Sequence, residues 1–393
     1  MAPQVARRAG IAPFHVMQVM KAAGERAATG GDVLHLEVGQ PATGAPEPVV
    51  EAAARALREG PLHYTDADGL PALRQRIGRW YAERYAVDVD PARVVVTTGA
   101  SGACVLAFLA CFDVGGAVAV ARPGYPCYRN MLSAFGTEVV DLPVDASSRF
   151  QPTAKHLDAA RAMVDGGHLA GLVVASPSNP TGTILDRPAL DALAASCREG
   201  DTWLVSDEIY HGITYGPPAT TALAVDDGAI VVSSFSKYFS MTGWRLGWLV
   251  VPPELVTPVE RLAQNLTVAP PTLPQQAGLA AFDAVAELDG HVARYAANRE
   301  VLLDGLAAAG FDRIAPADGA FYLWADVSAW TDDSQALCAE WLADLGVAVT
   351  PGIDFDPVDG HRFVRFSFAG ATVEIAAAVD RLAGWTAAHP PAR

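Results

Sequence analysis

The sequence Ser-Ser-Phe-Ser-Lys at residues 233–237, followed by Met-Thr-Gly-Trp-Arg-Leu-Gly at 241–247, lies at the centre of the predicted fold. Residues 229–232 (Ala-Ile-Val-Val) are apolar and mostly β-branched, so they predict a buried strand. Lys237 therefore follows the end of a strand, close to several hydroxyl groups and to Arg245. This arrangement brings an amine and a guanidinium group to one end of a buried sheet.

Lys237 can act as a nucleophile, because a lysine that is desolvated in such a position can lose its proton and attack a carbonyl carbon. Ser234, Ser236 and Arg245 can together bind a phosphate group. A nucleophilic lysine beside a phosphate site indicates a phosphorylated aldehyde as cofactor, and pyridoxal phosphate is the obvious candidate. The motif alone also fits a solvated loop lysine with incidental serines, so the rest of the chain has to separate the two interpretations.

Length and composition indicate a large globular enzyme or binding protein. The 393 residues allow two or three domains, and 51% hydrophobic with 18% charged residues is a globular composition. The formal net charge of −16 argues against a nucleic-acid scaffold, which needs a basic face. It does not argue against a small anionic ligand, because a local arginine cluster can reverse the field in one cleft.

The five cysteines are scattered and never form Cys-x-x-Cys, so they indicate reduced thiols and not a disulfide framework or a zinc site. No His/Cys cluster has metal-ligand spacing, and no signal peptide is evident. The longest uncharged run, residues 94–112, contains Thr-Thr-Gly-Ala-Ser-Gly and predicts a strand, a loop and a buried helix, not a membrane span. We therefore expect a soluble cytoplasmic protein without a nucleic-acid or membrane partner.

Strands are predicted near residues 94, 117, 172, 203, 230 and 248, and they largely alternate with helical or loop segments. This alternation predicts an α/β fold with a mainly parallel sheet, in which ligands bind at the carboxyl ends of the strands. A polar or aromatic candidate follows every strand but the last. In chain order these candidates are Ala100 and Ser101, Tyr125, Asn179, Asp207 with Tyr210, and Lys237.

Each candidate suits part of a cofactor site. Backbone N–H groups of the 97–102 loop, before a helix, can bind phosphate, and the Tyr125 ring could stack on a flat cofactor. Asn179 stands in a rigid proline loop, and Asp207 at a buried strand end needs a partner such as a pyridinium nitrogen. Taken singly, these features also fit ordinary turns and packing, but their shared position at one sheet edge favours a site.

Gly39 and Tyr64 precede the strands of this sheet in the sequence, and each has two possible roles. A strand predicted at 34–38 runs into Gly39, which could let the backbone approach a ligand or could simply form a turn. Tyr64 stands in a polar loop and is either a ligand-binding hydroxyl or a half-buried aromatic.

The pattern changes beyond about residue 285. Helices are predicted near 292–309, 335–345 and 372–388, with strands at 320–325 and 363–368. We expect a large α/β domain at 48–285 and a smaller α+β domain formed by 1–47 and 286–393. Arg365 lies inside an apolar strand of the smaller domain and needs an anion, which is either a structural carboxylate or a substrate carboxylate held bidentately.

With these residues the chain resembles the class I/II aminotransferases of the fold-type-I pyridoxal-phosphate superfamily, the aspartate aminotransferase superfamily. The resemblance runs from Gly39 to Arg365. Its most specific parts are Ser-Phe-Ser-Lys with Gly-Trp-Arg-Leu-Gly, Asn-Pro-Thr-Gly at 179–182 and Asp-Glu-Ile-Tyr at 207–210, in the order and approximate spacing of the family.

The resemblance implies a role for each candidate around the cofactor. Lys237 would form the internal aldimine and shuttle the proton between the substrate α-carbon and the cofactor. Asp207 would pair with the pyridine nitrogen, Tyr210 and Asn179 would hydrogen-bond the ring O3′, and Tyr125 would stack on the ring. The implied phosphate ligands are Ala100, Ser101, Ser234, Ser236 and Arg245.

The resemblance also implies a homodimer with shared active sites, because Tyr64 would reach the phosphate of the neighbouring subunit. Arg365 would bind the substrate α-carboxylate, with Gly39 and Asn179 beside it. The implied reaction moves an amino group from an L-amino acid to a 2-oxo acid by a ping-pong mechanism.

Several alternatives share these residues. C–S lyases, cyclopropane-carboxylate synthases and decarboxylases occur in the same superfamily. A non-catalytic DNA-binding regulator is disfavoured by the acidic charge and the retained Lys237, and a nicotinamide dehydrogenase by the lack of a glycine fingerprint.

The sequence gives only a weak indication of the substrate. No second arginine for a distal carboxylate can be assigned among Arg122, Arg129 and Arg261, so we expect alanine or valine as donor with pyruvate or 2-oxoglutarate as acceptor. Aspartate is the alternative donor.

Overall fold

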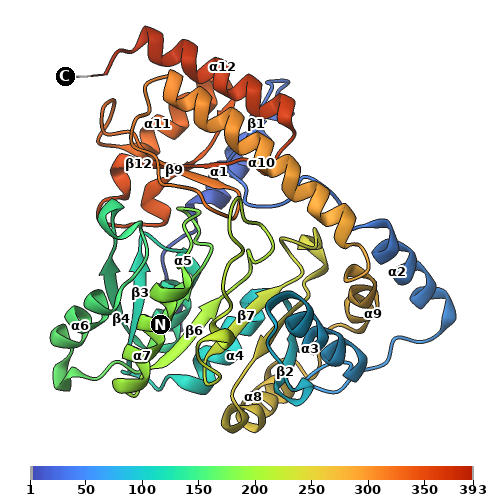
Figure 1. The fold of residues 1–393 in the computed structure, drawn as a ribbon. Coiled ribbons are helices and arrows are strands. Elements are labelled where there is room, and N and C mark those ends of the chain that lie inside the picture. Colours follow the sequence, from blue (N-terminus) through green and yellow to red (C-terminus); the bar gives the residue numbers. More distant parts are fainter. Residues whose placement is uncertain (1–2, 392–393) are drawn as a thin grey trace.

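The computed structural model describes residues 3–391 and is built around one seven-stranded sheet (Figure 1). The strands follow the spatial order β2-β8-β7-β6-β5-β3-β4. Their bounds are β2 Val94–Thr97, β3 Ala117–Arg122, β4 Glu138–Pro143, β5 Gly171–Ala175, β6 Trp203–Asp207, β7 Ile230–Ser234 and β8 Gly247–Val250.

The prediction of a mainly parallel α/β sheet is confirmed. Only β8 runs against its neighbours β2 and β7, whereas the other neighbouring strands of this sheet pair in parallel. The sequence analysis missed β4, which pairs with β3 at the edge of the sheet. Its Glu138 and Asp141 are not buried, so β4 lacks the continuous apolar run that marks the inner strands.

Both faces of the large sheet are buried, which explains why its inner strands are apolar throughout. Val94 and Val96 point into a core that includes side chains of α3, α6 and α7. Val95 points into the opposite core, which includes side chains of α4, α5 and α8. The same alternation continues in β5, where Val173 faces away from its two neighbours.

Twelve helices are described in residues 3–391. Their bounds are α1 His15–Ala28, α2 Glu47–Glu59, α3 Pro71–Tyr85, α4 Gly99–Cys111, α5 Pro126–Phe135, α6 Ala154–Met163, α7 Arg187–Glu199, α8 Pro253–Leu266, α9 Thr272–Ala281, α10 Val285–Ala308, α11 Ser334–Glu340 and α12 Thr372–Ala388. In these described residues no helix is both long and apolar enough to cross a membrane.

The C-terminal part contains two small sheets, beneath α10 and α12 at the top of Figure 1. One consists of β9 (Tyr322–Asp326), β12 (Phe363–Ser367) and β11 (Thr350–Pro351), all antiparallel. In the other, β1 (Leu34–His35) pairs with β10 (Val347–Ala348), which joins the N-terminal segment to the C-terminal part. The division into domains at 48–285 and at 1–47 with 286–393 stays a prediction.

Three predicted elements have different bounds in the structure. The strand expected at 34–38 is reduced to β1, because only its first two residues pair with β10. The helix expected from residue 292 begins seven residues earlier, at Val285. The loop expected at 97–102 ends at Thr98, since α4 already begins at Gly99. Ala100 and Ser101 therefore lie in the first turn of a helix, where backbone N–H groups have no partner within the helix.

Candidate active site

A cavity at the carboxyl ends of the parallel strands brings most of the predicted site residues together. Because β3, β5, β6 and β7 run in parallel, the segments that follow them emerge at the same edge of the sheet. The predicted residues that line the cavity are Gly39, Ala100, Ser101, Tyr125, Asn179, Asp207, Tyr210, Ser236, Lys237, Arg245 and Arg365. Ser234 and Tyr64 do not line it.

Lys237 projects into this cavity three residues after the end of β7. Its Nζ donates a hydrogen bond of 2.6 Å to the carbonyl oxygen of Gly39. Desolvation lowers the pKa of Lys237 to about 8, and the positive charges of Arg365 and Arg245 act in the same direction. A substantial fraction of the amine is therefore neutral, and hence nucleophilic, near pH 8.

Asp207, the last residue of β6, is buried at the far wall of the cavity. Its Oδ2 accepts a hydrogen bond of 2.5 Å from the Tyr128 hydroxyl, and its Oδ1 accepts one of 3.0 Å from the backbone N–H of Ile209. Burial raises the pKa of Asp207 to about 6, while these bonds act to lower it. At neutral pH the carboxylate is mostly ionised and can pair with a cationic ring nitrogen.

Tyr210 and Asn179 stand between this carboxylate and the C-terminal part of the chain. The Tyr210 hydroxyl lies 2.7 Å from the hydroxyl of Tyr322 on β9. The Asn179 Oδ1 accepts a hydrogen bond of 2.9 Å from Arg365 Nη1. This bond fixes the amide, so that its Nδ2 group is left to donate elsewhere.

Arg365 is buried without a carboxylate within 4 Å among residues 3–391. Its guanidinium donates to Asn179, to the Thr350 hydroxyl and to the backbone oxygen of Glu37, and its Nε has no partner in the same range. A buried cation in this condition is costly unless an anion is supplied from outside. Of the two predicted anions, the geometry therefore disfavours a structural carboxylate and favours a bound one.

A second concentration of positive charge lies at the N-terminus of α4. Arg245 has no acidic partner within 4 Å among the described residues, and its Nη1 bonds to Thr242 O at 3.1 Å. A Cβ on Gly99 would lie 2.5 Å from Arg245 Nη2, so glycine lets the guanidinium approach the helix start. The helix dipole and the arginine together place positive charge beside the N–H groups of Ala100 and Ser101.

Ser234 was predicted to bind the phosphate directly, but its side chain does not line the cavity. Its hydroxyl donates to Leu246 O at 3.0 Å, accepts from the Ser236 N–H and lies 2.9 Å from the Ser236 hydroxyl, which can donate to it. These bonds lie behind the cavity and hold Ser236, which does line it. Tyr64 is 84% exposed, and its predicted contact with a neighbouring subunit stays a prediction.

Part of the cavity wall is apolar. It is formed by side chains from the N-terminal segment and from α5 that the sequence analysis left without a site role. They are Phe14, Val16, Met17, Met20, Val38 and Met131. The Phe14 ring packs edge-on against Tyr125 with centroids 6.0 Å apart, so the N-terminal segment contacts the aromatic ring expected to stack on a cofactor.

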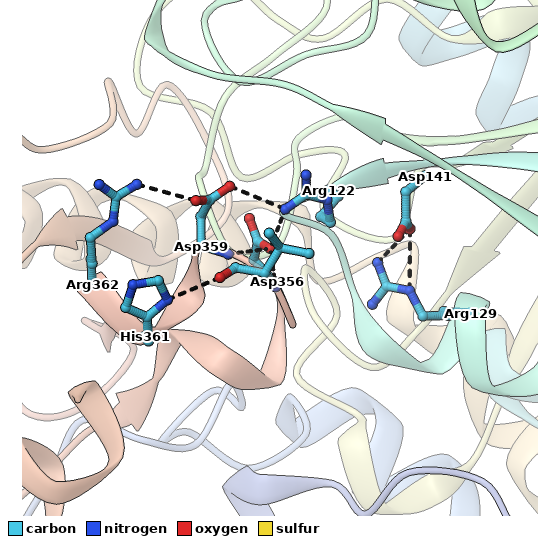
Figure 2. A network of polar contacts seen from close by, with 8 residues as sticks. Arg122, Arg129, Asp141, Asp356, Asp359, His361 and Arg362 are labelled. Atoms are coloured by element: carbon cyan, nitrogen blue, oxygen red, sulfur yellow. Dashed lines mark hydrogen bonds and ion pairs between the residues drawn. The ribbon is translucent and has the colours of Figure 1, made fainter. Parts of the chain in front are cut away.

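The arginines considered for a second carboxylate are engaged elsewhere. Figure 2 shows Arg122 facing Asp356 and Asp359, with Nη1 to oxygen distances of 2.6 and 3.2 Å. It also shows Arg129 facing Asp141, with Nη2 2.8 Å from Oδ1. Arg261 lies exposed on α8. None of the three lines the cavity.

Two further polar residues of the site were given no role from the sequence. Tyr128 lies three residues after Tyr125, and α5 begins between them, so helical spacing could have brought it to the same side. Tyr322 lies in an alternating strand whose buried positions are typical of core packing. Nothing in its neighbours along the chain separates a core tyrosine from a site tyrosine.

The sequence profile described as "Aminotransferase class I and II" matches residues 31–382. The chain belongs to the class I and II aminotransferase family. It is therefore an enzyme of the transferase class, in a family that depends on pyridoxal phosphate. The family resemblance drawn from the motifs is confirmed.

The alignments with individual relatives extend over 90% or more of this chain. The valine–pyruvate aminotransferase of Mycobacterium tuberculosis is 53% identical over 389 residues, which are 98% of this chain and 99% of the relative. The crystal structure of an aminotransferase from the same organism superimposes with a TM-score of 0.95 at 53% identity, over 98% of this chain and all of that one. The aspartate aminotransferase of Thermotoga maritima is 33% identical over 358 residues, 90% of this chain and 91% of the relative.

The lowered pKa of Lys237 gives a testable prediction. In competitive labelling of the cofactor-free protein with a small amine-reactive reagent, followed by mass spectrometry, the rate at Lys237 should rise with pH with a midpoint of about 8, because only the neutral amine reacts. Lys21, whose side chain is 79% exposed, is the internal reference for reagent concentration. A midpoint near the ordinary value of 10.5 would contradict the desolvated site.

Proposed function

We propose that the enzyme transfers the amino group of a small apolar L-amino acid, valine or alanine, to a 2-oxo acid such as pyruvate or 2-oxoglutarate. The observation that carries this proposal is the buried Arg365, which has no carboxylate within 4 Å among residues 3–391 and lines the same cavity as Lys237. An α-carboxylate bound to Arg365 would bring the α-carbon of an amino acid toward the lysine. The remaining side chain would then meet the apolar wall.

The residues present fit pyridoxal phosphate as cofactor. Lys237 would bind its aldehyde carbon, Asp207 would pair with the ring nitrogen, and Tyr210 and Asn179 would donate to the ring oxygen. Tyr125 would cover one face of the ring. The phosphate would lie between Arg245, the hydroxyls of Ser101 and Ser236, and the first turn of α4, where positive charge has no acidic partner among residues 3–391.

Pyridoxal phosphate supplies an electron sink for the charge that develops at the substrate α-carbon. The protein residues do the rest. Arg365 orients the substrate by a bidentate hold on its α-carboxylate, with the Asn179 amide fixed beside it. Lys237 Nζ, neutral near pH 8, removes the proton from the α-carbon. Tyr128 holds the Asp207 carboxylate toward the ring nitrogen.

The preference for an apolar donor is supported by two observations. Arg122 and Arg129 are consumed in ion pairs outside the cavity, so neither is available for a distal carboxylate. The wall that a substrate side chain would meet includes three methionines and no charged residue. The relative with 53% identity is named a valine–pyruvate aminotransferase, which agrees with this preference. Aspartate, the substrate named for the Thermotoga relative, is the alternative.

The substrate proposal is tested by an amino-acid panel without any 2-oxo acid. In the purified enzyme loaded with pyridoxal phosphate, valine and alanine should convert the visible absorption band to the amine form of the cofactor, because this is one complete half-reaction. The kcat/KM for valine should exceed that for aspartate at least about tenfold, since a buried carboxylate would lack a partner in the apolar wall.

Two results of that panel would contradict the proposal. A higher kcat/KM for aspartate than for valine and alanine would reassign the donor. A visible band that persists while pyruvate and ammonia accumulate would indicate a lyase.

A second prediction concerns Lys237→Ala. Turnover should fall by at least about 10³-fold, because both the covalent anchor and the proton-transfer group are lost. Pyridoxal phosphate should still bind through Arg245 and the α4 N-terminus, with a weaker Kd by equilibrium dialysis. The matched control is Lys155→Ala, since Lys155 lies on α6 outside the cavity. Full activity of the Lys237 variant would overturn the assignment.

We further propose a cytoplasmic homodimer in which Tyr64 completes the phosphate site of the neighbouring subunit. This is supported by the 84% exposure of Tyr64 on a loop held to α9 by a Thr272–His63 hydrogen bond of 2.6 Å. Exposed apolar side chains lie in both of the segments that this bond joins: Leu62 beside His63, and Val268 just before α9. All five cysteines are free thiols, as suits a reducing compartment.

Shared sites predict a measurable complementation. Tyr64→Ala should weaken pyridoxal phosphate binding, and Lys237→Ala should be inactive. When the two variants are dissociated, mixed and reassociated at low cofactor concentration, hybrid dimers should regain tight binding at the site that has both native residues. No gain over the separate variants, or a monomer in light scattering, would contradict the shared site.

A further inference from the structure

Tyr322 contacts three groups of the site but received no role from the sequence motifs. It is the first residue of β9 and is 1% exposed at the inner wall of the cavity. Its hydroxyl lies 2.7 Å from that of Tyr210, and the Arg365 guanidinium carbon lies 4.4 Å from the centre of its ring. A Cβ on Gly39 would lie 1.9 Å from its hydroxyl oxygen.

The hydrogen bond between the two tyrosines can run in either direction, and donation by Tyr322 is the direction that leaves no hydroxyl hydrogen buried away from the cavity without an acceptor. Among residues 3–391, the Tyr322 hydroxyl has Tyr210 as its only hydrogen-bond partner. If Tyr210 donated, the hydrogen of Tyr322 would be buried without an acceptor, which is unfavourable. If Tyr322 donates, the hydrogen of Tyr210 remains free to point into the cavity.

We propose that Tyr322 is a positioning residue for amino transfer: its hydroxyl donates to Tyr210 and directs the Tyr210 hydrogen into the cavity, and its ring supports the Arg365 guanidinium. This role rests on the proposed function, in which Tyr210 donates to the ring oxygen of pyridoxal phosphate. Burial raises the pKa of both tyrosines, so both hydroxyls keep their hydrogens at neutral pH.

The ring of Tyr322 acts on the substrate-binding side. Arg365 lies over its face at 4.4 Å and over the Phe355 ring at 4.6 Å. Such contacts stabilise a guanidinium without neutralising it. Arg365 is thus held in place while its charge remains available for an incoming carboxylate.

The hydroxyl of Tyr322 also explains the residue at position 39. Gly39 does not have a positive φ, so its backbone conformation does not by itself require glycine. The obstacle to a side chain is Tyr322, whose hydroxyl occupies the place of a Cβ. Because Gly39 O accepts from Lys237 Nζ, the same hydroxyl fixes how closely this backbone approaches the lysine.

The test uses the holoenzyme and the pH midpoint of its visible absorption band, which reports the proton on the lysine nitrogen joined to the cofactor. Donation by Tyr210 draws negative charge from the ring oxygen, so losing it should strengthen proton binding and raise the midpoint. Tyr210→Phe and Tyr322→Phe should both raise it, by about threefold to tenfold in the dissociation constant for Tyr322→Phe. The double variant should match Tyr210→Phe, because one hydroxyl acts through the other.

Tyr215→Phe is the matched control. Its hydroxyl donates a hydrogen bond of 2.5 Å to Ala320 O, next to β9, and Tyr215 does not line the cavity. The pH midpoint of the absorption band should therefore not move in this variant. Steady-state kinetics separate the role of the ring: Tyr322→Phe should leave the KM for the amino acid nearly unchanged, whereas Tyr322→Leu should raise it about threefold to tenfold through Arg365.

The outcomes distinguish this inference from the proposed function. A midpoint in Tyr322→Phe equal to wild type, or additive shifts in the double variant, would overturn the role of Tyr322 while the reaction stands. A wild-type enzyme without a visible band after addition of pyridoxal phosphate would overturn both. If Tyr322→Phe does not fold, Gly39→Ala displaces the same hydroxyl from the other side and should raise the midpoint too; an unchanged midpoint would contradict the inference.

Discussion

The guanidinium of Arg365 is buried among two aromatic rings, a threonine hydroxyl, an amide and a backbone carbonyl, with no carboxylate within 4 Å in the described residues. Each neighbour stabilises the cation partially, and none neutralises it. The chain therefore maintains a positive charge for a ligand, and the same charge helps to lower the pKa of Lys237. The charge of Arg365 thus acts on the Lys237 amine in the same direction as desolvation, which is the larger cause of its lowered pKa.

The apolar wall depends on a contact between the two ends of the chain. Asp354 accepts hydrogen bonds of 3.0 Å each from the backbone N–H groups of His15 and Val16, at the start of α1. These bonds satisfy two N–H groups that a helix cannot pair internally. They also fix the position of Val16 and its neighbours over the cavity. Most of the apolar wall thus comes from the N-terminal segment, with Met131 added from α5, but the start of α1 is held by a residue more than 300 positions away.

Much of the sheet was predictable, because apolar runs buried on both faces need no tertiary information to be recognised. The edge strand β4 was not, since its polar Glu138 and Asp141 interrupt the run. The polar residues at the strand ends were predictable for a similar reason, since Asp207 is the last residue of β6 and Lys237 comes three residues after β7. Tyr322 was not predictable, because its role arises from Tyr210, more than 100 residues away. Arg122 and its partner Asp356 are even farther apart along the chain, so the sequence left the availability of Arg122 open.

The antiparallel direction of β8 has a consequence for how the site assembles. Strand β7 ends and β8 begins at the same sheet edge, with Ser234 paired to Gly247. The connecting segment that carries Lys237 and Arg245 is therefore closed at its base by a β-hairpin ladder. Contacts of this kind are short-range along the chain and have a low entropic cost of closure. The amine and the guanidinium are therefore placed by contacts between near neighbours in sequence, whereas Arg365 belongs to β12, far along the chain.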